Sequence, residues 1–261
     1  MNVKSARESD VSIEFEGVEY SVSGSQRSVR ILQSVSLQIR RGEAVVLLGR
    51  SGSGKTTLLK LVNRMLQPTA GEVRVQGIST GQWEAIKLRR SIGYVIQETG
   101  LFPHWSVAMN VTLVPRLEKW PLVRWVERGD EMMRLVGLDP DQFARRKPRE
   151  LSGGQRQRVG VARALAGDPP ILLMDEPFGA LDPVTRAELQ REFAALAKRL
   201  AKTIVFVTHD LREALLIGSR IVLLQEGKVV ADAPPAEFLH LDHPEVKAFT
   251  ASLQVEGATL P

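Results

Sequence analysis

Cysteine is absent from the 261 residues of this chain. The protein therefore has no disulfide and no thiolate metal site, which fits a reducing compartment. No apolar run approaches the ~18–20 residues that a membrane-spanning helix needs. Residues 1–10 are polar and charged and contain no apolar signal core, so secretion is not indicated. These absences predict a cytosolic protein without a membrane span of its own.

Blocks of five or six like charges are also missing, which argues against a nucleic-acid-binding tail. The formal net charge is nevertheless +5, which permits an anionic partner such as a nucleotide or a lipid surface. A generally basic surface is the simpler explanation of that charge. The length allows one large α/β domain or two small ones.

Two kinds of strand pattern run along the chain. Residues 13–20 and 29–39 alternate apolar and polar side chains, which predicts antiparallel strands joined by a turn over 21–28. Short continuous apolar runs, typical of buried parallel strands, occupy 45–48, 92–96, 171–174 and 204–207. Each run ends in polar or glycine-rich residues. Because ligands of open α/β sheets bind beyond the carboxyl ends of strands, we expect a composite active site at that edge.

The strand pattern disappears between Gln97 and Pro148. Helices are expected there over 106–118, 123–136 and 142–146, broken by Pro115, Pro121 and residues 137–140. This predicts a helical insertion that holds three tryptophans, for which core packing is the default expectation: Trp105, Trp120 and Trp125. Trp105 also lies beside Pro103-His104, where a partner can dock. Further on, the pattern predicts a helix over 211–216, strands over 221–224 and 228–230, and helices near 235–239 and 244–252.

Residues 49–56 match the phosphate-loop pattern G-x-x-x-x-G-K-[ST] and lie between an apolar run and the helical segment 56–66. The glycines let backbone N–H groups wrap a β-phosphate, Lys55 brings a charge to the β/γ oxygens, and Thr56 offers a hydroxyl to Mg²⁺. The predicted ATP-binding residues here are Gly49, Arg50, Ser51, Gly52, Ser53, Gly54, Lys55, Thr56 and Thr57.

Asp175 and Glu176 directly follow the run over 171–174. In a phosphate-loop protein the first carboxylate at such a strand end holds the magnesium shell. The adjacent Glu176 can then polarise the attacking water, an effect worth about 10²–10⁴-fold. A helix cap is the alternative explanation, which Pro177 weakens. Gln97 also reaches Mg²⁺ or water from its strand end, although glutamine is common in loops.

A second phosphate-ready helix start lies at Ser152, Gly153, Gly154 and Gln155. The first three of these residues can present free N–H groups and the positive end of a helix dipole to a γ-phosphate. An ordinary N-cap is the alternative. The chain thus has two phosphate-ready helix starts but one strand end whose residues can hold the metal and the water. A single nucleotide therefore need not use both helix starts from the same chain.

Two further side chains are candidates by position. His209 follows the run over 204–207 and can bond the γ-phosphate, although a lone histidine is more often structural. Tyr20 lies just before the turn over 21–28 and can stack on adenine, and a half-buried strand tyrosine is the competing explanation.

The order of these motifs resembles the nucleotide-binding subunit of ATP-binding-cassette (ABC) transporters from about Ile13 to Ser252. The matching features are the phosphate loop, Gln97, Leu-Ser-Gly-Gly-Gln at 151–155, Asp175-Glu176, Ala180-Leu181-Asp182 and His209. The resemblance implies an α/β P-loop NTPase fold with an antiparallel β subdomain. It further implies one domain over 12–252, a helical subdomain at about 98–165, and tails at 1–11 and 253–261.

The resemblance also implies a mechanism. Two copies pair head to tail, and residues 152–155 of one cover the ATP held by 49–56 of the other. Glu176 is then the general base, His209 contacts the γ-phosphate, and Asp182 joins the nucleotide site and couples the two sites. Mg²⁺ is expected on Thr56, Gln97 and Asp175.

Residues 61–64, 92–97, 100–104 and 175–186 carry a finer resemblance to importers of glycine betaine, carnitine and choline, although importers of other polar solutes share parts of it. It implies integral-membrane permease subunits and a solute-binding protein as partners, no nucleic acid, and a peripheral location on the cytoplasmic face of the inner (plasma) membrane. Several such subunits carry C-terminal regulatory cystathionine-β-synthase-type domains. Only about thirty residues follow Val230, so regulation through such a module is not expected.

Two alternatives remain. A cytosolic cassette protein acting on ribosomes or DNA usually carries two cassettes or a long coiled-coil insertion, and neither pattern occurs here. A nucleotide kinase shares the phosphate loop but has no use for residues 152–155.

Overall fold

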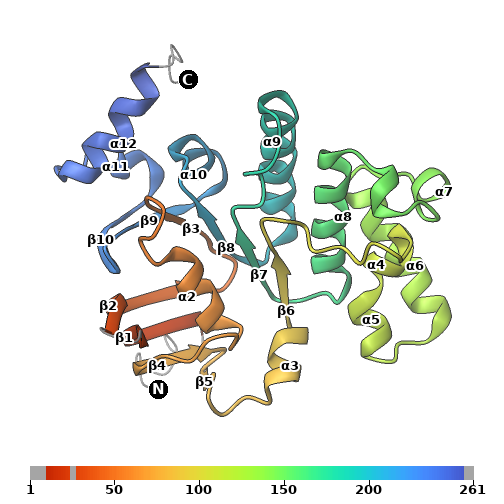
Figure 1. The fold of residues 1–261 in the computed structure, drawn as a ribbon, viewed down its shortest axis with the longest axis horizontal. Coiled ribbons are helices and arrows are strands. Elements are labelled where there is room, and N and C mark those ends of the chain that lie inside the picture. The colour runs from red at the N-terminus through yellow and green to blue at the C-terminus, as the bar shows by residue number, and fades with distance from the viewer. Residues whose placement is uncertain (1–9, 24–27, 256–261) are drawn as a thin grey trace. The chain divides into compact units, whose positions relative to one another are not determined.

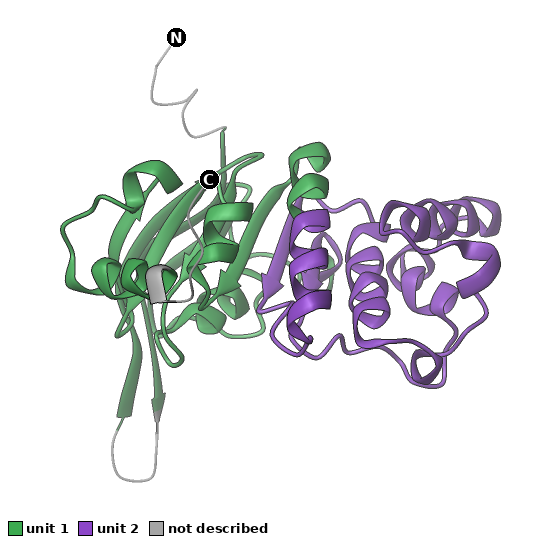
Figure 2. Cartoon of the chain, turned by 90° about the horizontal axis from the view of Figure 1, so that it is seen from above, with its two compact units in different colours: residues 1–88, 194–261 green, residues 89–193 purple. Residues whose placement is uncertain are grey.

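The computed structural model describes residues 10–23 and 28–255. The chain forms two compact units, residues 1–88 with 194–261 (unit 1) and residues 89–193 (unit 2), coloured separately in Figure 2. Helix α3 (Ala85–Arg90) and helix α9 (Pro183–Leu200) each contain a boundary between the units.

Unit 1 contains an antiparallel sheet in the order β2-β1-β4-β5 (Figure 1). Its strands are β1 (Val11–Ser23), β2 (Ser28–Arg40), β4 (Ala70–Val75) and β5 (Ile78–Ser79). Ile13, Phe15 and Val18 of β1 are buried. Ile13 and Phe15 follow the alternation seen in the sequence, and Val18 comes after a shift in the β1–β2 register. The two long strands were predicted, although residues 21–23 and 28 belong to them rather than to a turn. The rest of the predicted turn, 24–27, lies outside the described residues.

The second layer of unit 1 places its strands in the order β10-β9-β3-β8. They are β3 (Ala44–Leu48), β8 (Thr203–Thr208), β9 (Arg220–Gln225) and β10 (Lys228–Ala233), with β3 parallel to both β8 and β9. Every residue of β8 is buried, as its continuous apolar run predicts. The helices lying wholly in this unit are α2 (Lys55–Val62), α10 (Leu211–Ile217), α11 (Pro235–Phe238) and α12 (Pro244–Val255).

Unit 2 combines the parallel pair β6 (Ile92–Val95) and β7 (Ile171–Asp175) with a group of helices. The helices are α4 (Val107–Val111), α5 (Leu113–Leu117), α6 (Leu122–Leu135), α7 (Pro140–Phe143), the 3₁₀ helix η1 (Pro148–Glu150) and α8 (Gly153–Ala166). Helix α8 packs against α4, α5, α6 and β6. The buried α8 residues Val159, Ala162 and Leu165 form its contribution to the core.

The predicted helix break at Pro115 was wrong by a few residues. Pro115 lies inside α5, and the break falls at Thr112, between α4 and α5. Proline has no N–H to bond the carbonyl of Val111, so the first helix cannot continue through it. In the first turn of a new helix that N–H is not needed. No helix in the described part of the chain has the length and apolar character required to cross a bilayer.

Candidate active site

The phosphate loop joins the carboxyl end of β3 to the start of α2. Gly54 occupies the N-cap position with φ 103°, and it has no side chain that can cap the helix. The helix start thus has no side-chain cap, and such a start is a favourable place for an anion. A Cβ atom at Gly54 would lie 2.6 Å from Cδ2 of Leu32, so close packing and the positive φ both require glycine here.

The Lys55 side chain is buried inside this loop. Its Nζ donates to the carbonyl oxygens of Gly49 at 2.7 Å and Arg50 at 2.9 Å, so the loop curls around the ammonium group. Ser53 Oγ is buried and has no hydrogen-bond partner among the described residues. A buried hydroxyl without a partner is costly, and a phosphate oxygen in the loop is a ligand that satisfies it.

His209 emerges at the same sheet edge as the phosphate loop. The parallel register pairs Leu48 with Thr208, and the loop and His209 follow these two residues. The Thr208 hydroxyl donates to the Glu213 carboxylate and accepts the N–H of Asp210 at 2.9 Å. These bonds fix the backbone on both sides of the exposed His209.

Tyr20 lies on β1, and the neighbouring strand β2 packs against the phosphate loop. It pairs with Leu32 across the β1–β2 ladder, and Leu32 is the residue that packs against Gly54. Tyr20 is a half-buried strand residue, and this environment leaves it available for stacking. Adenine stacking stays a prediction.

Unit 2 brings its own polar side chains to one strand edge. The register pairs Val95 with Met174, so the segment leading to Gln97 runs beside Asp175. A Cβ atom at Gly179 would lie 3.4 Å from Gln97 Nε2 and 3.9 Å from Glu176 Oε2. The Gln97 amide and the Glu176 carboxylate therefore border the same small space.

Glu176 itself has φ 43°, in the left-handed region that side chains other than glycine rarely adopt. Such strain is concentrated at functional sites, where the surrounding structure holds the residue in place. The positive φ turns the chain sharply after β7, immediately behind the buried Asp175.

Tyr94 is a site residue that the sequence did not reveal. Tyr94 lies on β6, the strand next to β7, and its hydroxyl is 3.4 Å from Asp175 Oδ2. Burial raises the pKa of Tyr94, and the negative charge of Asp175 raises it further. The phenol thus keeps its proton and can donate to the carboxylate. In the sequence Tyr94 is one member of an apolar run, with no local signal of this role.

Residues 152–155 form a capping box at the start of α8. The Ser152 hydroxyl accepts the N–H of Gln155 at 3.2 Å, and the Gln155 side chain accepts the N–H of Ser152 at 2.9 Å. The sequence predicted free N–H groups at Ser152, Gly153 and Gly154. The prediction was wrong for Ser152, whose N–H is taken by this box. Gly153 and Gly154 remain among the first-turn donors that lack an intrahelical partner.

The segment around Asp182 packs on this helix start within unit 2. A Cβ atom at Gly153 would lie 3.3 Å from Leu181 Cδ2, and one at Gly154 would lie 2.7 Å from Thr185 Cγ2. The Asp182 carboxylate accepts the N–H of Thr185 at 3.0 Å, and this bond holds the pKa of Asp182 below its ordinary value. Asp182 thus caps α9 next to the helix start of α8.

The residues expected to hold magnesium differ from a cluster of strong metal ligands. Within the described residues, no group of three His, Cys, Asp or Glu side chains is placed to hold a metal. Thr56, Gln97 and Asp175 offer only oxygen donors and a single carboxylate. Mg²⁺ is typically held by one or two carboxylates together with waters and substrate phosphates, so this set fits that ion.

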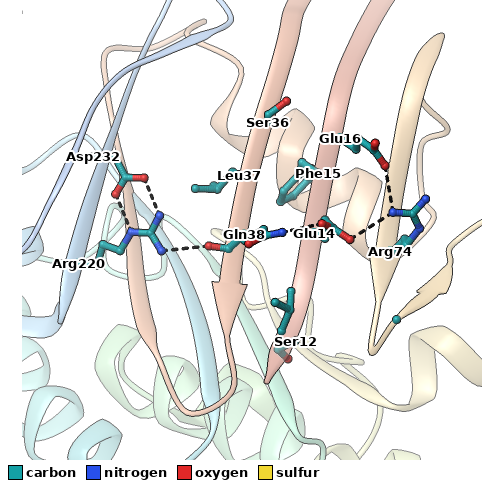
Figure 3. A pocket seen from close by; sticks show the side chains of 12 residues that line it. Ser12, Glu14, Phe15, Glu16, Ser36, Leu37, Gln38, Arg74, Arg220 and Asp232 are labelled. Atoms are coloured by element: carbon teal, nitrogen blue, oxygen red, sulfur yellow. Dashed lines mark hydrogen bonds and ion pairs between the residues drawn. The ribbon is translucent and has the colours of Figure 1, made fainter. Parts of the chain in front are cut away.

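Among the described residues of unit 1, two of the cavities bear on the site. One, of about 320 Å³, is lined by the loop residues 50–53, by residues 224–226 and by Glu245. The larger, of about 910 Å³, lies along the antiparallel sheet, where Glu14 and Glu16 bind Arg74 and Asp232 binds Arg220 (Figure 3). The arginines of the larger cavity are already paired with carboxylates, whereas the smaller cavity lies beside the phosphate loop.

The ABC transporter family model matches residues 32–179, more than half of the chain. The chain is 48% identical over 86% of its length to the choline transport ATP-binding protein OpuBA of Bacillus subtilis. It is 47% identical over 81% to the osmoprotectant import ATP-binding protein OsmV of Salmonella typhimurium. It spans 58% and 55% of those two relatives. It also shares 49% identity with the glycine betaine uptake system ATP-binding protein YehX of Escherichia coli, over 87% of this chain and 72% of the relative.

Solved structures agree with the fold. A dimeric post-hydrolysis state of the ATP-binding cassette MJ0796, bound to ADP and phosphate, matches with a TM-score of 0.77 and 35% identity, over 85% of this chain and 98% of the other. The structure of cbiO1 from Clostridium perfringens matches with a TM-score of 0.79 and 27% identity, over 95% and 96%. With its phosphate loop, its Ser152 helix start and these relatives, the chain belongs to the ABC transporter family and has the fold of its ATP-binding cassettes.

Proposed function

We propose that this chain is the ATP-hydrolysing subunit of an ABC importer for a quaternary-amine osmoprotectant such as glycine betaine, carnitine or choline. The observation that carries ATP use is the buried Lys55 ammonium inside a glycine loop at the uncapped start of α2. The transport role rests on similarity to ATP-binding proteins of choline transport, osmoprotectant import and glycine betaine uptake.

In the proposed reaction, water attacks the γ-phosphorus of ATP, and the bond to the oxygen that bridges the β- and γ-phosphorus breaks. Glu176 accepts a proton from the water, while Lys55 and His209 hold γ-phosphate oxygens. Tyr20 stacks on the adenine. Thr56, Gln97 and Asp175 are the residues that would hold Mg²⁺, which neutralises charge on the β- and γ-oxygens when bound.

The nucleotide site is completed by a second copy of the chain. Gly153 and Gly154 of one copy direct N–H groups at the γ-phosphate on the loop of the other, and Asp182 couples the two sites. Shifting the ratio of closed to open dimer from 1:99 to 99:1 needs about 5.5 kcal/mol of binding free energy in favour of the closed state. Charge-assisted hydrogen bonds worth ~1.5–3 kcal/mol each, made to two nucleotides, are sufficient.

A permease docks on an aromatic and apolar surface of unit 2. Phe102 stacks on Trp105 with 4.4 Å between ring centroids, and the Arg116 guanidinium lies 5.6 Å from the Trp105 ring and 5.7 Å from that of Trp125. The sequence expectation that the tryptophans pack in the core was wrong, because all three are only half-buried. Exposed apolar side chains extend this surface on α6, at Leu122, Val123 and Val126. The chain is then peripheral, on the cytoplasmic face of the membrane.

Transport is tested by expressing the chain with its neighbouring permease and solute-binding genes in cells that lack osmoprotectant uptake. Uptake of labelled glycine betaine, competed by carnitine or choline and absent with Glu176→Gln, is the expected result. Uptake of a different polar solute instead would support the second candidate, an importer with another cargo. ATP hydrolysis without any copurifying membrane protein would point to a non-transport cassette ATPase.

A further inference from the structure

An ion pair joins the C-terminal helix α12 to the phosphate loop. Glu245, in the first turn of α12, accepts from Arg50 Nε at 2.5 Å, although the two residues lie 195 positions apart. The Glu245 side chain is only 13% exposed, whereas that of Arg50 is 71% exposed. Both belong to unit 1, and both line the cavity of about 320 Å³ beside the loop.

Helix α12 holds Glu245 in a defined position. Val246, next to it, is fully buried, and Leu253 is buried near the other end of the helix. The His243 ring accepts the N–H of Glu245 at 3.2 Å. Helix α12 also packs against α10, the helix that begins just after His209. The carboxylate is therefore presented by an anchored element rather than by a loose tail.

Arg50 connects this carboxylate to the loop. Its side chain binds Glu245, while its own carbonyl oxygen accepts Lys55 Nζ at 2.9 Å and the N–H of Ser53 at 3.2 Å. One residue thus links α12 to the ammonium group that meets the β- and γ-phosphates in the proposed function. A largely buried negative charge beside a phosphate site repels the nucleotide unless a cation neutralises it.

We propose that the Glu245–Arg50 pair makes the ATP affinity of the phosphate loop depend on helix α12. Glu245 sets the affinity below the maximum that the loop can reach, and Arg50 limits that reduction by neutralising the carboxylate. Glu245 is a positioning residue, and so is the side chain of Arg50, because both act through the electrostatic field at the loop, whereas the backbone of Arg50 belongs to the loop that binds ATP. This inference rests on the proposed function, since it requires that residues 49–56 bind ATP.

The test is a double-mutant cycle on the full chain, with the dissociation constants of ATP and ADP measured by calorimetry. Glu245→Gln removes the charge and should tighten ATP binding about threefold to tenfold, and Arg50→Ala should weaken it by a similar factor. The double variant should return close to the wild-type value. The effect of Arg50→Ala should shrink as salt rises from about 0.05 M to about 0.5 M, because the exposed Arg50 charge is screened. The effect of Glu245→Gln should shrink less, because the Glu245 charge is largely buried.

A matched control lies on the same helix. Lys247 binds Asp242 at 2.5 Å, but this pair is exposed and lies outside the cavity. Lys247→Ala should leave ATP affinity unchanged. A merely structural role for α12 would make Glu245→Gln and Arg50→Ala both weaken binding, and that result, or no change in either, overturns the proposal. If the wild-type chain fails to bind ATP at all, the proposed function itself is wrong.

Discussion

Ser152 and Gln155 hold each other through two reciprocal hydrogen bonds: the N–H of Gln155 donates to the Ser152 hydroxyl oxygen at 3.2 Å, and the N–H of Ser152 donates to the Gln155 side-chain oxygen at 2.9 Å. This arrangement leaves the Ser152 hydroxyl engaged in its own helix, so the N–H groups of Gly153 and Gly154 become the better candidates for contact with phosphate. Ser152 then acts on catalysis largely by shaping the helix start.

Replacing Ser152 by alanine should therefore have two separable effects. Loss of the cap should lower the free energy of unfolding by about 0.5–2 kcal/mol, measured in urea. ATP hydrolysis should fall while ATP binding by the monomer stays within about twofold, since in the proposed function the monomer binds ATP through residues 49–57. Ser152→Thr keeps a capping hydroxyl and should preserve both properties. Equal loss of monomer binding in Ser152→Ala would mean that this helix start acts on the nucleotide of its own chain.

Glu176→Gln should suppress turnover while ATP binding persists. Removing a general base costs about 10²–10⁴-fold in rate, and the amide keeps the size of the side chain at this strained position. Size-exclusion chromatography with ATP should show a stable dimer, because hydrolysis no longer reopens it. Hydrolysis at the wild-type rate would exclude Glu176 as the base.

Arg163 ties the loop that follows Gln97 to helix α8. Its guanidinium is largely buried, which lowers its pKa, and it donates to the carbonyl oxygens of Thr99 at 2.6 Å and Gly100 at 2.7 Å. Arg163→Ala should destabilise the chain by roughly 2–4 kcal/mol, because two carbonyls lose a charged donor. Denaturant unfolding checks this. Arg191, whose guanidinium donates only to the carbonyl of Ala187 on its own exposed helix face, is the control and should change stability little.

The cap formed by Asp182 predicts a pH dependence. Because its folded pKa lies below the ordinary value of 3.8, its contribution to stability is fully present above pH 3.8 and is lost as the pH falls through the folded pKa. Asp182→Asn keeps a capping side chain but removes the charge. The difference in melting temperature between wild type and variant should therefore be constant from about pH 5 to 7. Below pH 3.8 this difference should fall towards zero. A difference that grows in acid would contradict this assignment.

The sequence predicted the parts of the fold that follow from local patterns. The runs before Gly49, Asp175 and His209 are short and apolar, and burial on both faces makes such runs strands. Helix α9 was not predicted, although its buried residues Leu189, Phe193 and Leu196 recur at helical spacing. The contacts of Tyr94 with Asp175 and of Arg50 with Glu245 join distant positions, so no local pattern in the chain records them.

Packing constrains Gly154, to which the proposed function also gives a chemical role. A Cβ atom there would lie 2.7 Å from the methyl carbon of Thr185, closer than side chains tolerate, so Gly154→Ala must displace α8 or the start of α9. We expect this variant to lose about 1–3 kcal/mol of stability, as overpacked cores do, and to lose hydrolysis as the helix start shifts.

Thr185→Ser supplies the matched rescue, because it removes the offending methyl and retains the N–H that Asp182 accepts. In the Gly154→Ala background it should restore stability to within about 1 kcal/mol of wild type by denaturant titration. ATPase activity should return with it if helix placement alone was at fault. Recovered stability without recovered activity would mean instead that the methyl group added at position 154 blocks the approach of the nucleotide to these N–H groups.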